Sequence, residues 1–145
     1  MVKNFSNDDF QQCCDLYIQV FNAPPWNDQW TKERAQIRLQ DFIDNKRFIG
    51  FTFWDNDTLV GVVFAHMSTF YGGDEVFIDE LFISTAHQRK GYGMILMDTI
   101  EKFAKENNCV NITLLTGRGK PSFDFYEKRG YKSSDFIAFM YKRIE

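Results

Sequence analysis

The sequence has few of the side chains that bind transition metals or serve as nucleophiles. Among its 145 residues are two histidines, His66 and His87, and three cysteines. A zinc site or a Ser-His-Asp triad therefore has little material to draw on, and we expect no bound metal. Cys13 and Cys14 are adjacent and Cys109 stands alone, without a C-x-x-C spacing. We expect all three to be reduced thiols rather than disulfide partners.

Long apolar runs are also missing. No stretch approaches the roughly 20 apolar residues that a membrane-spanning helix needs, and the N-terminal MVKNFSNDDF lacks the apolar core of a signal peptide. We therefore expect a cytoplasmic protein with no membrane partner. The net charge of −3 argues against a nucleic-acid partner, because affinity for phosphate backbones comes largely from clustered Lys and Arg. A small cationic substrate fits this charge better.

The sequence is rich in apolar and aromatic side chains. Hydrophobic residues make up 44% of the chain, and 16 of them are phenylalanine. This share supports a compact core or a pocket lined with rings, without help from disulfides or metal. No repeat, linker or low-complexity tract interrupts the chain, so we expect one domain over residues 1–145.

Periodicity predicts an α/β protein with a mixed sheet, neither a barrel nor a plain doubly wound sheet. Cap residues and helical spacing of apolar positions predict four helices, at about 10–21, 31–43, 94–105 and from Pro121 onward. Alternating or continuous apolar runs predict strands, in addition to a short one near the N-terminus, at 48–54, 59–67, 75–83, 111–115 and 136–141.

A glycine-containing segment, HQRKGYG at 87–93, joins the strand 75–83 to the helix 94–105. Gly91 and Gly93 at such a junction either allow close packing of the helix or let backbone approach a phosphate. A dinucleotide fingerprint would need a third glycine where the chain has Leu96. It would also need an acid after the next strand, where Thr116 and Gly117 stand.

A P-loop is excluded as well, because no G-x-x-x-x-G-K-[ST] is present. What remains is an anion cradle, in which backbone N–H groups at a helix N-terminus face a negatively charged ligand. The neighbouring Arg89 and Lys90 add positive charge.

Two motifs carry a resemblance to a known family. Residues 88–93, QRKGYG, form a complete Q-x-x-G-x-G, and residues 125–131, FYEKRGY, form F-Y-x-x-x-G-[FY]. Both resemble motifs of the GNAT superfamily of acyl-CoA-dependent N-acyltransferases, and the order of elements is similar over nearly the whole chain. The resemblance implies a mixed, mostly antiparallel sheet of six to seven strands, flanked by about four helices. It also implies that the central strands 75–83 and 110–115 are splayed, with the pantetheine arm of the cofactor between them.

The resemblance implies acetyl-CoA as co-substrate, with its pyrophosphate on the glycine loop and the thioester carbonyl at a backbone N–H near Phe82 or Ile83. One position departs from the family pattern, because Lys120 stands where relatives often carry an asparagine. A lysine there could contact a cofactor phosphate. The expected cofactor-binding residues are Phe82, Ile83, Gln88, Arg89, Lys90, Gly91, Tyr92, Gly93, Met94, Lys120, Ser122 and Phe125.

Acyl transfer to an amine requires a base for the ammonium proton and an acid for the leaving thiolate. Asp79 and Glu80 are acids in an otherwise apolar strand that leads to the glycine loop. Strict alternation places their side chains on opposite faces, so only one is expected in a cleft, with Glu80 slightly favoured. Alternatively, each acid pairs with a Lys or Arg of a neighbouring element. By resemblance, Tyr126 is the acid that protonates the thiolate of coenzyme A.

The acceptor site is expected near PPWNDQW, residues 24–30, where relatives have a variable loop. Trp26, Asp28 and Trp30 offer two indoles and a carboxylate, which suit an amine cation. The alternative is that this turn only pins two helices together. The sequence thus predicts direct N-acetylation of a small, cationic primary amine, with a homodimer expected by analogy. The rival hypothesis is a module that binds acyl-CoA as a sensor or scaffold without catalysis.

Overall fold

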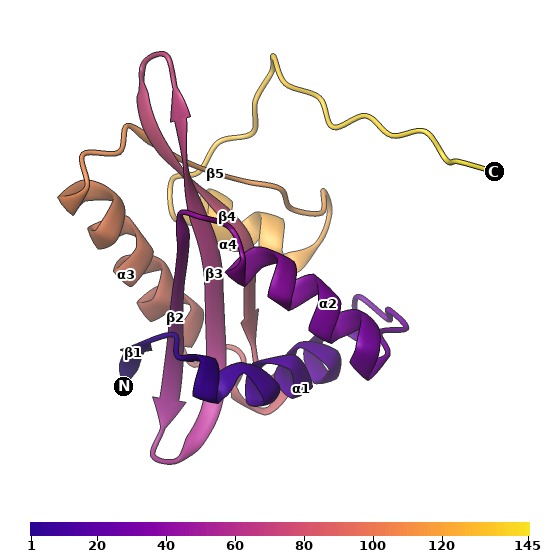
Figure 1. Cartoon of the computed structure of the whole chain (residues 1–145). Helices are drawn as coiled ribbons and strands as arrows, with labels where there is room; N and C mark the ends of the chain where they lie inside the picture. The colour runs from indigo at the N-terminus through magenta and orange to yellow at the C-terminus, as the bar shows by residue number, and fades with distance from the viewer. The chain divides into compact units, whose positions relative to one another are not determined.

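The computed structural model describes residues 1–145 as two compact units, 1–115 and 116–145. The first unit contains a five-stranded mixed sheet and three α-helices (Figure 1). Its strands are β1 (Val2–Asn4), β2 (Phe48–Asp55), β3 (Thr58–Phe70), β4 (Gly73–Ile83) and β5 (Asn111–Leu114). Its helices are α1 (Phe10–Phe21), α2 (Lys32–Ile43) and α3 (Tyr92–Glu106), with short 3₁₀ turns η1 (Asn7–Asp9) and η2 (Thr85–His87).

The sheet has the order β1-β2-β3-β4-β5. The first three pairings are antiparallel and the last, between β4 and β5, is parallel. That parallel pairing covers only Glu75 to Ile78 of β4, opposite Asn111 to Leu114, while β4 continues to Ile83. The central strands therefore separate after Ile78, as the family resemblance implies, and β5 leaves one edge of β4 uncovered from Asp79 onward.

Helices pack on both faces of the sheet. Val62 and Phe64 of β3 lie in one apolar core with residues of α1 and α2. Gly61 lies on the other face, since a Cβ there would meet Leu96 of α3 at 3.0 Å. Alternation along β3 thus assigns α1 and α2 to one face and α3 to the other. Figure 1 shows α1 and α2 together in front of the sheet and α3 behind it.

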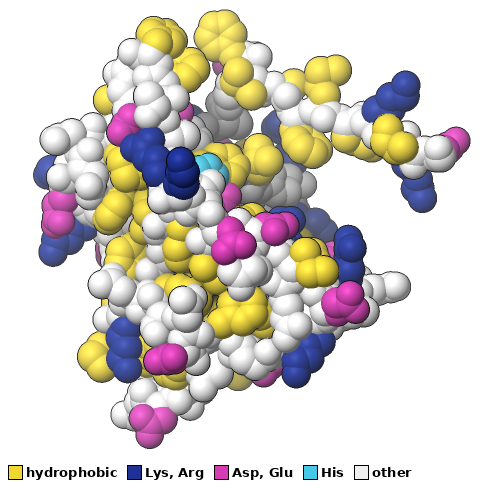
Figure 2. Space-filling view, viewed as in Figure 1, with side chains coloured by type: hydrophobic (Ala, Val, Ile, Leu, Met, Phe, Trp, Pro, Cys, Tyr) yellow, Lys and Arg dark blue, Asp and Glu magenta, His cyan; other side chains and the backbone are white.

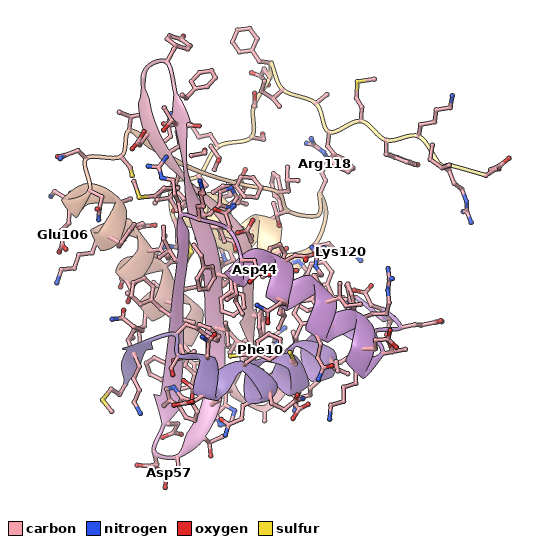
Figure 3. The ribbon with its side chains drawn as sticks, in the orientation of Figure 1. Phe10, Asp44, Asp57, Glu106, Arg118 and Lys120 are labelled. Carbon is pink, nitrogen blue, oxygen red and sulfur yellow. The ribbon has the colours of Figure 1, made fainter.

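Capping explains where the helices begin and end. The side chain of Thr31 accepts a hydrogen bond from the backbone N–H of Arg34, which satisfies one of the free donors of the first turn of α2. Figure 3 marks the start of α1 at Phe10 and the residue that follows α2, Asp44. Asn22 ends α1 and its side chain holds the backbone of Trp30 through two hydrogen bonds, which fixes the loop between the helices.

The second unit contains α4 (Pro121–Lys128), which begins with proline at its first position, as the sequence predicts. The segment after α4 has no strand, so the strand expected at 136–141 is wrong, and the sheet has five strands rather than six or seven. A strand needs a partner for its backbone groups, and the segment 116–145 contains no second strand. The apolar side chains of Phe136 and Met140 are almost fully exposed there. None of the helices has the length and apolar character needed to span a bilayer.

Candidate active site

A β-bulge in β4 determines how its two acids are oriented. Phe64 of β3 lies opposite Glu80, but the next residue, Ala65, lies opposite Ile78, so Asp79 has no partner of its own on β3. An extra residue of this kind breaks the alternation of side chains. Asp79 and Glu80 consequently both contact groups on the face covered by α1 and α2, and the expectation that they point to opposite faces is wrong.

Glu80 is held by one residue from each helix of that face. Its Oε2 accepts a hydrogen bond from the hydroxyl of Tyr17 on α1 at 2.8 Å and from Nε of Arg38 on α2 at 3.1 Å. Both bonds end on the same oxygen, so Oε1 remains for a further contact. The pairing of Glu80 with Arg38 corresponds to the alternative in the sequence analysis, in which each acid pairs with a Lys or Arg of a neighbouring element.

Asp79 pairs with a histidine that the sequence analysis did not assign to the site. The distance between Oδ2 of Asp79 and Nδ1 of His66 is 2.9 Å. His66 lies two residues after Phe64 on β3, so its side chain shares the face of Phe64. The sequence offered no signal for this pair, because the contact depends on the bulge that turns Asp79 toward β3.

Burial makes both acids stronger bases than exposed carboxylates. Only 14% of the Glu80 side chain and 8% of the Asp79 side chain are exposed. Loss of solvent raises the pKa of Glu80, while Arg38 and Tyr17 act in the opposite direction. Loss of solvent also raises the pKa of Asp79, against the effect of His66. Perturbed acids of this kind concentrate at functional sites.

The uncovered edge of β4 presents backbone groups beside these acids. The N–H of Ser84 bonds to the carbonyl of Val60 on β3 at 2.8 Å, so alternation directs the N–H of Phe82 toward β3 as well. Ile83 and Leu81 then point their N–H groups to the open edge. Nε2 of Gln88 donates to the carbonyl of Ile83 at 3.1 Å, which agrees with this direction. A backbone N–H at Phe82 or Ile83 was expected to bond the thioester carbonyl. Of these two residues, only Ile83 directs its N–H to the open edge, and Leu81 becomes a further candidate.

The glycine loop has the backbone geometry of an anion cradle. Gly91 caps α3 in the left-handed region with φ of +82°, and Arg89 also has a positive φ, of +64°. The first helical hydrogen bond runs from the N–H of Ile95 to the carbonyl of Gly91. The N–H groups of Tyr92, Gly93 and Met94 precede that bond and lie at the positive end of the helix dipole.

The loop is anchored from both sides. The ring of Tyr92 packs against Phe53 of β2 with 4.8 Å between centroids. Nδ1 of His87 lies 3.1 Å from the hydroxyl of Ser84, just after β4. Lys90 has an exposed side chain and no fixed partner, so its charge is available for a ligand.

The second unit contains the remaining predicted cofactor residues. Lys120 precedes α4 as its cap and extends from the segment that also bears Arg118 (Figure 3). The hydroxyls of Ser122 and Thr116 lie 2.8 Å apart and tie the start of α4 to the preceding chain. Their roles toward a cofactor remain predictions.

The Tyr126 ring lies 5.1 Å from Phe125 and 5.7 Å from Tyr131. The backbone carbonyl of Tyr126 also accepts the N–H of Tyr131. This turn closes the second predicted motif. The roles of Tyr126 and Phe125 stay predictions.

The predicted acceptor loop lines an open hollow. Asp28, Gln29, Trp30 and Arg34 surround a volume of about 400 Å³. Nε1 of Trp30 donates to Asp28 at 3.0 Å. The same indole packs against Tyr17 at 5.1 Å, and the guanidinium of Arg38 lies 5.7 Å from its centre.

Trp26 lies apart from this hollow, with its ring against Phe21 at 5.7 Å. The structure therefore brings Asp28 and Trp30 together at the hollow and connects Trp30 to Glu80 through Tyr17 and Arg38. The role of Trp26 toward an acceptor remains a prediction.

Comparison with known proteins agrees with this arrangement. The sequence model of the acetyltransferase (GNAT) family matches residues 10–131. No curated protein is similar to the sequence at a significant level. Among solved structures, a possible acetyltransferase from Clostridium difficile 630 superposes with a TM-score of 0.84 at 13% identity, over 100% of this chain and 98% of its own.

Two aminoglycoside-modifying enzymes share the fold at low identity. The aminoglycoside 6'-N-acetyltransferase AAC(6')-IG from Acinetobacter haemolyticus has a TM-score of 0.77 at 15% identity, over 100% of this chain and 99% of its own. AAC(6')-Iy, in complex with a bisubstrate analogue made of CoA and acetylneamine, has a TM-score of 0.75 at 13% identity, over 99% and 98%. The match to the family sequence model spans most of the chain and includes both predicted motifs, and the chain therefore belongs to the GNAT acetyltransferase family.

Proposed function

We propose that the protein is an acetyl-CoA-dependent N-acetyltransferase that moves the acetyl group directly to a primary amine of a small, cationic acceptor. The observation that carries this proposal is the bulge of β4. It places two shielded acids, Asp79 and Glu80, beside the strand edge that β5 leaves open. The glycine loop follows directly along the chain. A base, a backbone donor and an anion cradle are thus consecutive parts of one segment, residues 79–94.

The cofactor would bind along this segment. The N–H groups at the start of α3, with Arg89 and Lys90, would hold the pyrophosphate. The open edge at Leu81 and Ile83 would bond the pantetheine arm, and one N–H there would polarise the thioester carbonyl. For Lys120, Ser122 and Phe125, the proposed contacts with the cofactor follow from the resemblance of their segment to the family.

The chemistry divides between the acids of β4 and a tyrosine. The acidic centre of Asp79 and Glu80 would remove the proton that keeps an ammonium from attacking. The neutral amine would then attack the thioester carbon. Tyr126 would protonate the departing thiolate, since a phenol with an ordinary pKa of about 10 is reasonably matched to a thiol.

The cysteines support direct transfer rather than an acetyl-enzyme. Cys13 and Cys14 are fully buried in α1, and burial raises the pKa of Cys14 to about 11 and that of Cys13 further. Burial also raises the pKa of Cys109. Because the thiolate is the reactive form, none of the three is poised to accept an acetyl group.

The acceptor site supports a cation. Asp28 and Trp30 line the hollow at the start of α2, and Arg38 links the Glu80 carboxylate of β4 to Trp30. Indoles and carboxylates bind ammonium groups through cation–π contacts and charge. The similar aminoglycoside acetyltransferases also favour a polyamine-like or aminoglycoside-like acceptor.

The proposed enzyme would act in the cytoplasm as a homodimer. Support for self-association comes from the row of exposed apolar side chains at Phe136, Ile137, Phe139, Met140, Tyr141 and Ile144. Exposed apolar area of this extent marks an interaction surface. Sedimentation velocity at several protein concentrations measures whether the chain is a dimer.

The test combines cofactor binding with turnover. The protein is titrated with acetyl-CoA in a calorimeter and then incubated with acetyl-CoA and a panel of cationic, neutral and acidic amines, with release of free thiol as the readout. We expect thiol release with cationic amines. Tight binding without release from any amine would favour the non-catalytic module, and release with only neutral or acidic amines would contradict the cationic acceptor.

A further inference from the structure

The pair formed by His66 and Asp79 has the geometry of a base and the residue that orients it. We propose that the Nε2 atom of His66 takes the proton from the acceptor ammonium, and that Asp79 positions the imidazole rather than reacting itself. This inference rests on the proposed acetyltransferase function and identifies the residue through which the acidic centre of β4 acts.

The hydrogen bond fixes the tautomer of the ring. An ionised carboxylate only accepts, so the contact of 2.9 Å from Oδ2 of Asp79 places the imidazole proton on Nδ1. Nε2 then bears the lone pair. The same division of labour between a carboxylate and an imidazole operates in Ser-His-Asp sites, where the carboxylate holds the ring and the far nitrogen takes the proton.

Exposure distinguishes the two partners. The side chain of Asp79 is 8% exposed and that of His66 is 23% exposed, so the imidazole is the accessible member of the pair. The ring of Phe77, directly opposite on β4, lies 5.5 Å from the imidazole centre and limits its rotation. Figure 2 shows that acidic side chains (magenta) and basic side chains (dark blue) are both present on this face of the molecule.

Glu80 is less suited to be the proton acceptor. Its Oε2 already accepts bonds from Tyr17 and Arg38, and both bonds favour the ionised form. A carboxylate held in this way supplies a fixed negative charge for the ammonium. The charged groups that interact with Asp79 of the pair are Arg38 of α2 and Glu80 of β4, and Tyr17 of α1 bonds to Glu80.

The proton balance is complete without another reactant. An N–H bond of the ammonium breaks and its proton bonds to Nε2 of His66. The amine nitrogen forms a bond to the thioester carbon, the carbon–sulfur bond breaks, and a second proton from nitrogen ends on the thiolate through Tyr126. Imidazolium then releases its proton to solvent, which leaves amide, coenzyme A and one free proton.

The experiment compares His66→Gln, Asp79→Asn and Glu80→Gln with the wild type. The measurements are kcat/KM for the best amine from pH 5 to 9, acetyl-CoA affinity by calorimetry and thermal unfolding. We expect His66→Gln to lose about 10²-fold or more in kcat/KM and the acidic limb of the pH profile, with acetyl-CoA affinity unchanged. Added imidazole should restore part of the activity of His66→Ala. His87→Gln, the change at the other histidine, should keep the acidic limb.

Asp79→Asn should lower kcat because an amide no longer enforces the tautomer, but it should keep an acidic limb, because the imidazole of His66 is still present. The inference is overturned if His66→Gln keeps the wild-type profile while a carboxylate variant loses it. The inference is also overturned if His66→Gln lowers kcat/KM without changing the pH profile and added imidazole does not rescue His66→Ala, since that result indicates a structural role of His66. If the wild-type protein releases no thiol with any amine, that result overturns the proposed function together with this inference.

Discussion

At the scale of single residues, Arg38 combines an ion pair with two ring contacts at the site. Its guanidinium bonds to Glu80 at 3.1 Å and lies over the rings of Trp30 and Phe42, at 5.7 and 5.0 Å. One planar cation therefore neutralises a shielded carboxylate and packs the acceptor loop against α2. A lysine could supply the charge but not the flat face that stacks on rings.

Replacing Arg38 by methionine is expected to destabilise the fold by about 1–3 kcal/mol, because Glu80 would lose its only cationic partner while staying shielded. The side chain of Arg38 is 44% exposed, which keeps the expected loss at the low end. Urea unfolding of the wild type and of Arg38→Met measures this loss of stability. The double variant with Glu80→Gln should recover part of the loss, and a cycle in which the two changes simply add would contradict the coupling.

Tyr126→Phe isolates the predicted acid. Removing only the hydroxyl keeps the ring contacts with Phe125 and Tyr131, so acetyl-CoA affinity should change much less than kcat. We expect kcat to fall by about 10²-fold, the low end for acid catalysis, because a thiolate leaves more easily than an alkoxide. Steady-state kinetics and calorimetry measure both quantities, and unchanged kcat would remove the acid assignment.

At the scale of elements, the start of α3 depends on a backbone conformation that glycine alone adopts readily. Gly91 has φ of +82°, and a Cβ built there would meet no atom within 4 Å. Gly91→Ala should therefore cost about 1 kcal/mol through backbone strain alone. The strain should also weaken acetyl-CoA binding, since it acts on the N–H groups of the cradle.

Gly72→Ala is the matched control. Gly72 is also surrounded by open space, but its φ is outside the left-handed region. It should change neither stability nor acetyl-CoA affinity. Equal effects of the two substitutions, measured by urea unfolding and calorimetry, would show that the conformation of Gly91 is not what the loop requires.

The sequence predicted most elements because local signals agree with the fold. Thr31 caps α2 and Pro121 begins α4, as expected from their positions before and within helical patterns. The strand at 136–141 was predicted from its apolar run and is absent, because pairing depends on a partner that no local pattern contains. The bulge at Asp79 was missed for the same reason, since it is defined only by its register against Phe64 and Ala65.

At the scale of the whole molecule, Glu80 of β4 connects the sheet to both helices of one face. Tyr17 comes from α1, Arg38 from α2 and Glu80 from β4, and they form one continuous set of hydrogen bonds. In the chain, Glu80 is 63 positions from Tyr17 and 42 positions from Arg38. The site therefore exists only when the three elements are packed, which links its protonation to the stability of the fold.

Glu80 should make stability depend on pH in a defined direction. Burial raises the pKa of Glu80 in the folded protein above its ordinary value, which is the value in the unfolded chain. Between these two pKa values the folded state holds more protons than the unfolded state. The contribution of Glu80 to the unfolding free energy is thus fully present below its ordinary pKa. This contribution is lost as pH rises through the pKa of Glu80 in the folded protein.

Glu80→Gln mimics the protonated side chain and keeps an acceptor for Tyr17. The unfolding free energy of the wild type minus that of this variant should therefore decrease as pH rises from about 4 to 7, because only the wild type must ionise a shielded carboxyl. Urea unfolding at each pH measures the difference. Glu106→Gln, at an exposed glutamate of α3 that is labelled in Figure 3, should show no such slope. A difference that grows with pH would instead mean that attraction to Arg38 outweighs burial, and that Glu80 is held ionised by its ion pair.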